Sequence, residues 1–220
     1  DVVLSRDNYF KEVTVSAIGE MTVIEYYFAS AILLFLLLCG IPCSVFLKRE
    51  SKALRAKLKI AGVRPWQIVL SKWIAVTVLY FIIILILGGL SFIIYAFLGN
   101  SWIKVSMLQI LAMVPVVMSV SAMIVFVYEL MKSPVESVMF LFISTIIMLF
   151  LSGGFIPIGF LPEIIGKISP LIPTSFLLNQ MGAVITDEIT VPTTMITLII
   201  AFGFYILSIS IDSWRQSQQD

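Results

Sequence analysis

The stretch that decides the fold is residues 48–72, KRESKALRAKLKIAGVRPWQIVLSK. It holds eight of the fourteen Lys and Arg residues of the chain, together with a single acid, Glu50. Long apolar runs abut this basic island on both sides. A basic segment between two hydrophobic runs has two uses: it marks the cytoplasmic face of a membrane protein, or it offers a surface on which a soluble partner binds.

Composition agrees with a membrane protein. Of the 220 residues, 60% are hydrophobic and 12% are charged, and the mean hydropathy is +1.09. Soluble domains are about half apolar and about a quarter charged. We therefore expect an all-α polytopic membrane protein, in which lipid surrounds most of the apolar side chains.

Several kinds of chemistry are excluded or disfavoured by the residues present. The chain has no histidine, which excludes His-based metal ligation and Ser-His or Cys-His catalysis. It has neither a phosphate-binding loop ending in Lys-Ser or Lys-Thr nor a GxSxG motif. Cys39 and Cys43 lie four residues apart in an apolar run, where a packing role is favoured over metal or redox chemistry. We expect no catalytic residue, no metal site and no cofactor bound by this chain.

Hydrophobic runs predict five membrane spans within a transmembrane domain over residues 21–212. Gly40 and Pro42 are expected to bend the first span near its inner end. Residues 1–20 are interpreted as the end of an extracellular region of a longer gene product, and residues 213–220 as a cytoplasmic tail. The predicted spans cover residues 21–47, 73–98, 105–129, 137–155 and 191–211.

The basic island itself divides into parts. Leu54, Leu58 and Ala61 recur at helical spacing, which predicts a short amphipathic helix along the membrane. Gly62 is placed to end that helix in a left-handed cap. Pro65 then suits the first turn of the next helix, so the island predicts a helix, a break and the entry to the second span.

A Gly- and Pro-rich segment precedes the last span. Residues 152–155, Ser-Gly-Gly-Phe, form the end of the fourth predicted span, and residues 156–190 are apolar but contain too many prolines for one plain helix. A short amphipathic stretch after Pro162 and a second short helix over residues 175–184 suit a re-entrant or interfacial hairpin. This hairpin is either a gate over a substrate path or a structural lid. Its candidate gate residues are Gly153, Gly154, Pro157, Pro162, Pro170 and Pro173.

The distribution of Lys and Arg predicts the orientation. If the island is inside, that side carries ten of these residues, counting Lys132 and Arg215, and the other side carries four. Cytoplasmic segments are richer in Lys and Arg, so the island and the C-terminus are expected to be cytoplasmic and the hairpin external. We expect the chain to lie in the plasma membrane.

Polar residues within the spans allow two interpretations. They line a pathway, or they join helices by hydrogen bonds, as Ser and Thr in membrane helices often do. No two acids share one face of a span, which disfavours a proton- or sodium-coupled carrier. The pathway candidates are Ser119, Ser121, Ser144 and Thr145.

In order and spacing, these segments resemble the membrane subunit of ABC-2-type ATP-binding-cassette exporters over nearly the whole chain. The run from Lys48-Arg49-Glu50 to Pro65-Trp66 looks like the cytoplasmic segment that holds the coupling helix of that family. Residues 152–176 are similar to its external hairpin before the last span. The chain departs from the family in having five predicted spans rather than six, which leaves out the first. Ser51-Lys52 also stands where the family often has Gly-Thr.

The resemblance implies a permease subunit of an ATP-driven exporter, which is not itself an enzyme. ATP and Mg²⁺ would be bound by a separate ATPase subunit, and a second permease subunit and membrane lipids would be the other partners. Nucleic acid is not expected as a partner. The implied cargo is hydrophobic or amphipathic: a drug, an antimicrobial peptide or a lipid-like molecule. The alternative is a membrane scaffold or sensor whose island binds lipid or a signalling partner. The implied ATPase-coupling residues are Arg49, Glu50, Leu54, Arg55, Leu58, Gly62, Pro65 and Trp66.

Overall fold

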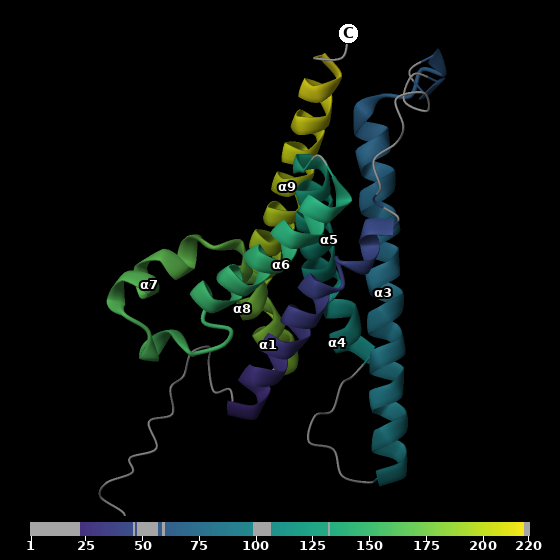
Figure 1. Cartoon of the computed structure of the whole chain (residues 1–220). Coiled ribbons are helices and arrows are strands. Elements are labelled where there is room, and N and C mark those ends of the chain that lie inside the picture. The colour runs from purple at the N-terminus through teal and green to yellow at the C-terminus, as the bar shows by residue number, and fades with distance from the viewer. Residues whose placement is uncertain are drawn as a thin grey trace, which may run out of the picture.

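The computed structural model describes residues 23–45, 47, 57–58, 60–98, 107–131 and 133–217. Within these residues the secondary structure is helical (Figure 1). The longer helices are α1 (Val23–Leu38), α3 (Pro65–Leu98), α5 (Val114–Leu130), α6 (Pro134–Leu151), α8 (Pro173–Ile185) and α9 (Val191–Ser217). The shorter ones are α4 (Met107–Ala112), α7 (Glu163–Ile168) and the 3-10 turns η2 (Pro42–Val45), η3 (Ile158–Phe160) and η4 (Ser169–Leu171).

Five helical segments in the described part of the chain are long and apolar enough to cross a membrane. They correspond in order to the five predicted spans, so the expected all-α polytopic fold is confirmed. The segments are Val23–Ser44, Pro65–Ile86, Gln109–Leu130, Pro134–Leu151 and Val191–Trp214.

Several helix bounds differ from the predicted spans for local reasons. The third span is interrupted at Met113, because Pro115 has no N–H to donate to the carbonyl one turn earlier. The fourth helix begins at Pro134 rather than 137, since the Ser133 hydroxyl caps it by accepting a hydrogen bond from the Glu136 N–H, 3.2 Å away. The first helix ends at Leu38, ahead of Gly40 and Pro42, and a 3-10 turn follows from Pro42; the predicted bend of this span remains a prediction.

Helix α5 forms the centre of the bundle. Twelve of its seventeen residues are buried, and it packs against α1, α3, α6, α8 and α9. A helix that is apolar all round is a buried helix. In contrast, α6 buries only a narrow stripe of residues spaced four apart, and its outward side chains are apolar, which suits contact with lipid. The stripe is Ser137, Leu141, Thr145 and Leu149.

The helices alternate in direction, so particular connections meet at one end of the bundle. In Figure 1 the start of α3, the junction of α5 with α6 and the end of α9 lie at one end. The starts of α1 and α9 lie toward the other end, with the end of α3 (Figure 1). We call the end of the bundle that holds the start of α3 the Pro65 end. The described helix ends that adjoin the segments predicted to be cytoplasmic are thus gathered on one side of the bundle.

Candidate functional site

The junction between the basic island and α3 is built from two local caps. Gly62 has φ of +76°, and the Val63 N–H donates to the Leu58 carbonyl at 3.0 Å, the bond of a Schellman C-cap. At the start of α3, the Arg64 N–H donates to Gln67 Oε1 at 2.8 Å. The predicted cap at Gly62 and restart at Pro65 are therefore confirmed.

The predicted coupling residues are only partly within the described chain. Leu58 is half-buried, whereas Trp66 is exposed. The structure thus places one apolar side chain on each side of the Gly62 break. The remaining coupling residues, Arg49, Glu50, Leu54 and Arg55, lie outside the described residues.

Helix α3 runs from Pro65 to Leu98 as one element. The sequence predicts the second span to begin at Trp73, with residues 65–72 in the coupling segment. In the structure those residues are instead the first two turns of the same helix. The end of the coupling segment and the second span are therefore one continuous helix, without a break between them.

Aromatic residues fasten the start of α3 to its neighbours. The Trp73 ring stacks on Tyr205 of α9, with centroids 5.0 Å apart and planes 25° apart. The Trp73 indole N–H donates to the Met118 carbonyl of α5 at 3.0 Å. The Tyr205 hydroxyl donates to the Trp66 carbonyl at 3.3 Å. The first turns of α3, at the end of the basic island, are therefore held by α5 and α9.

An ion pair joins α3 to α5 next to the aromatic contacts of Trp73. Lys72 Nζ lies 2.7 Å from Glu129 Oε1, and the two side chains are only 10% and 6% exposed. The pair was missed in the sequence, where the partners are 57 residues apart. The available signal was that both residues stand at span ends on the side predicted to be cytoplasmic. Since a shielded charge needs a partner, two opposite charges at such positions are candidates for pairing.

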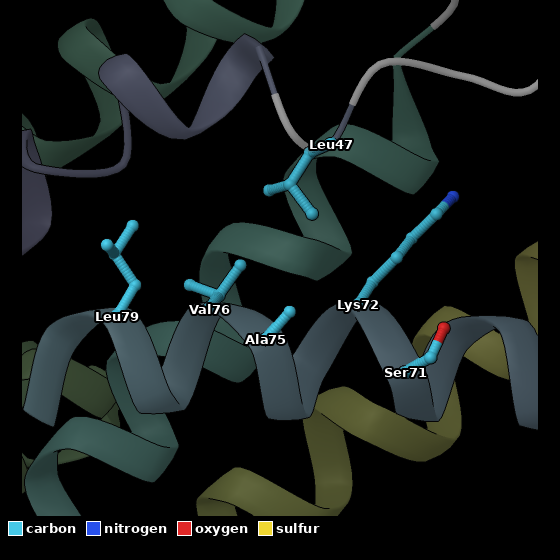
Figure 2. A pocket seen from close by; sticks show the side chains of 6 residues that line it. All are labelled: Leu47, Ser71, Lys72, Ala75, Val76 and Leu79. Atoms are coloured by element: carbon cyan, nitrogen blue, oxygen red, sulfur yellow. The ribbon is translucent and has the colours of Figure 1, made fainter.

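A cavity of about 520 Å³ lies beside this pair. Figure 2 shows Leu47 above it and successive residues of α3 below it. Among the residues that the structure describes, the lining combines an aliphatic wall with the Lys72 ammonium group and the Ser71 hydroxyl. These described lining residues are Leu47, Ser71, Lys72, Ala75, Val76 and Leu79.

The pathway candidates occupy different environments. Ser119 is fully buried and donates to the Thr197 carbonyl at 2.6 Å, which joins α5 to α9. Ser121 shares a 2.7 Å hydrogen bond with Thr77, which joins α5 to α3. Ser144 donates to a carbonyl of its own helix, and Thr145 is buried on the packed stripe of α6. The contacts of Ser119 and Ser121 are those of helix packing, and a pathway role for the four residues remains a prediction.

Hydrogen bonds from α1 hold the two candidate gate glycines, Gly153 and Gly154. The Tyr26 hydroxyl donates to the Gly153 carbonyl, and the Ser30 hydroxyl donates to the Gly154 carbonyl at 2.5 Å. Gly153 has φ of +88°, and a Cβ there would lie 2.7 Å from Ile158 Cγ1. A Cβ on Gly154 would lie 2.7 Å from Leu149. The chain leaves α6 in this tight form because both residues lack a side chain.

The predicted hairpin is a bent pair of helices. Residues Glu163–Leu171 and Pro173–Ile185 make an angle of 83°. The Ser175 hydroxyl donates to the Ser169 carbonyl at 2.6 Å across the bend. The prolines mark the element boundaries: Pro157 precedes η3, Pro162 precedes α7, Pro170 lies in η4 and Pro173 begins α8. The second short helix predicted over residues 175–184 is confirmed as α8, and the gate role remains a prediction.

The two arms of the hairpin differ in burial. Most of α8 is buried, and it packs between α1 and α9. In Figure 1, α7 projects from the bundle on the side away from α3. Large apolar side chains of this arm are exposed, among them Ile164 and Leu171, as is Phe160 in the preceding turn η3. An exposed apolar arm of this kind suits an interfacial segment.

These features define a class: a multi-pass helical membrane protein with a capped basic segment at one end and a bent helix pair before its last span. Residues 10–210 match the family model described as ABC-2 family transporter protein. The chain therefore belongs to the ABC-2 transporter family, which confirms the resemblance drawn from its motifs. It is a membrane permease of an ABC transporter, a type of subunit that associates with an ABC ATPase. No curated protein and no solved structure gives a significant match.

Proposed function

We propose that this chain is the permease subunit of an exporter that moves a hydrophobic or amphipathic cargo out of the cell. A separate ATPase subunit, which binds ATP and Mg²⁺, docks on the basic island and drives the cycle. The observation that carries this proposal is the continuity of α3, which starts at the end of the capped island and becomes a membrane span.

The contacts that α3 makes with α5 and α9 would transmit a movement of α3 to those helices. Leu58 and Trp66 are apolar side chains on either side of the Gly62 break, and Trp is among the residues that carry most of the binding energy at protein interfaces. Movement of the island displaces Pro65 and hence the whole of α3. Because Lys72 is paired with Glu129, and Trp73 contacts α5 and α9, those helices must follow or exchange their contacts.

A second permease subunit completes the pathway in this proposal. The centre of the single bundle is filled by α5, whose side chains are mostly buried. A path for cargo is therefore better formed between two bundles than through one. The outward faces of α6 and α9, which carry exposed Phe142, Ile146, Ile199 and Phe202, are left for lipid and for the partner subunit.

The orientation is part of the proposal. The Pro65 end is assigned to the cytoplasm of a plasma-membrane protein, and residues 156–190 to the outer face. The support is the ten-to-four distribution of Lys and Arg together with the gathering of the α3 start, the α5–α6 junction and the α9 end on one side (Figure 1).

The test is to replace Leu58 and Trp66, singly, with Glu. The control is Val191→Glu, which places the same charge on an exposed apolar residue at the other end of the bundle. The complex of permease and ATPase is purified through the permease, and both ATPase recovery and ATP hydrolysis are measured. We expect both island variants to lose the ATPase or its coupling, and the control to retain them. Wild-type recovery and hydrolysis in both island variants would show that the docking assignment is wrong.

A further inference from the structure

The cavity beside α3 has a polar end and an apolar end. Lys72, Val76 and Leu79 are spaced four and three residues apart, so they follow one stripe along the helix. Lys72 stands nearest to Pro65, and Leu79 is farthest into the span. In Figure 2 the Lys72 ammonium points away from Val76 and Leu79, while Leu47 faces them from across the cavity.

Its size is that of a ligand site. Pockets that hold small molecules have volumes of roughly 300 to 1,000 Å³ and mostly apolar walls with a few polar groups. This cavity has about 520 Å³ and a wall of Leu47, Ala75, Val76 and Leu79. An apolar wall with a charged group at its end, as the described lining provides, matches an amphiphile rather than a wholly polar or wholly apolar ligand.

The charge that the cavity presents is positive. Lys72 is the charged residue in its described lining, and its partner Glu129 lies on α5 and is 4% exposed. An ammonium has three N–H donors and carries a full positive charge, so an anionic group can share Lys72 with its partners in the protein, Glu129 among them. A cationic ligand would meet Lys72 first and could reach Glu129 only by breaking a shielded ion pair.

We propose that this cavity binds an amphiphile with a single apolar chain and an anionic headgroup. The headgroup bonds the Lys72 ammonium at the Pro65 end, and the chain lies on Leu47, Val76 and Leu79. The role of this amphiphile as cargo taken up from the adjoining leaflet rests on the proposed export function. Its binding to the cavity is independent of that function.

The site also places the ligand on a helix contact. Lys72 bonds Glu129 of α5, and the next residue, Trp73, contacts α5 and α9. A headgroup on Lys72 therefore shares the ammonium with Glu129 and so weakens the α3–α5 ion pair. Cargo binding would in this way act on the same contacts through which α3 moves the bundle.

The test measures equilibrium binding of dodecyl phosphate to the full chain in neutral phosphatidylcholine nanodiscs, with empty nanodiscs as background. Dodecyltrimethylammonium, with the same chain and opposite charge, and inorganic phosphate are the comparison probes. Ala75→Trp fills the cavity, and Ile74→Trp adds the same side chain at an exposed neighbouring position outside the lining. The double variant Lys72→Gln/Glu129→Gln removes both charges together and so avoids leaving one unpaired.

We expect the wild type and Ile74→Trp to bind dodecyl phosphate about tenfold or more tightly than dodecyltrimethylammonium, with inorganic phosphate alone showing no binding. Ala75→Trp should weaken binding of dodecyl phosphate by about tenfold or more, because it occupies the place of the chain. The double variant should lose the preference for the anion and still bind both amphiphiles. Equal affinity of the wild type for the two amphiphiles, or equal binding by Ala75→Trp and Ile74→Trp, would overturn the site.

A second measurement separates the site from the export function. ATP hydrolysis by the assembled complex is followed with and without dodecyl phosphate. An increase that Ala75→Trp abolishes supports the cargo role, whereas an unchanged rate overturns that role and leaves the binding result standing. If Leu58→Glu and Trp66→Glu fail to uncouple the complex, the docking proposal is wrong. The amphiphile-binding measurements then still test whether the cavity is a binding site.

Discussion

Lys72 of α3 and Glu129 of α5 form a 2.7 Å ion pair whose side chains are 10% and 6% exposed. The pair lies next to the aromatic contacts of Trp73 and two turns from the start of α3. It couples the helix that leaves the basic island to the central helix of the bundle. Its behaviour under substitution therefore tests how the two helices are joined.

Removal of one partner should be costly. We expect Lys72→Ala to destabilise the protein by about 3 to 5 kcal/mol, since it leaves the Glu129 carboxylate without its Lys partner in a shielded position. Lys72→Met/Glu129→Leu should recover most of that loss, because it removes both charges and keeps apolar volume. Thermal unfolding in detergent measures both variants. A double variant that is no more stable than Lys72→Ala would mean that the pair is not the dominant interaction of these residues.

The glycine at the end of α6 should not tolerate a side chain. Gly153→Ala forces φ of +88° on a residue with a Cβ and brings that atom to 2.7 Å from Ile158. We expect a loss of stability of about 1 to 3 kcal/mol. Gly203→Ala is the matched control, because a Cβ there meets nothing within 4 Å. In a helix it should be neutral or stabilising by up to about 1 kcal/mol. The same unfolding midpoint for both variants would contradict the assigned geometry.

The hydroxyls of α1 should hold the hairpin in place. Tyr26→Phe and Ser30→Ala each leave a buried glycine carbonyl without its donor. The expected loss is about 1 to 3 kcal/mol for each variant, together with faster proteolysis within residues 156–172. Tyr27→Phe, at an exposed neighbouring position, is the control and should behave as the wild type. Unchanged proteolysis in both α1 variants would indicate that the hairpin is held by other contacts.

The orientation can be measured with thiol reagents. In a background with Cys39 and Cys43 replaced by Ala, Ile60→Cys and Phe160→Cys each introduce one exposed thiol, at positions 86% and 70% exposed. An impermeant maleimide added to intact cells should label Phe160→Cys and spare Ile60→Cys until the membrane is opened. Labelling of Ile60→Cys from outside would reverse the proposed topology.

A packing role for Ser119 and a pathway role make different predictions. Ser119→Ala removes a 2.6 Å hydrogen bond between α5 and α9, and it should cost about 1 kcal/mol of stability with little effect on cargo-stimulated ATP hydrolysis. A large change in that stimulation at unchanged stability would favour the pathway interpretation. The measurement pairs an unfolding midpoint with the hydrolysis rate of the assembled complex.

The sequence by itself determined what depends on local chemistry. Hydropathy over some twenty residues identifies a membrane span whatever its neighbours are, so the five spans were predictable. The cap at Gly62 and the helix start at Pro65 depend on residues within one turn, and both were found where predicted. The family followed from the order of these local features and from the bent segment before the last span.

Only the tertiary structure decided which residues meet across the bundle. Lys72 and Glu129 are 57 residues apart, and Tyr26 and Gly153 are 127 apart. Their pairing depends on how the helices are rotated and offset against one another. Hydropathy does not specify that rotation in a chain whose helices are apolar on most faces, because many rotations bury similar apolar area. The basic island shows the same division: its caps are local, whereas the helices that α3 contacts are set by residues far along the chain.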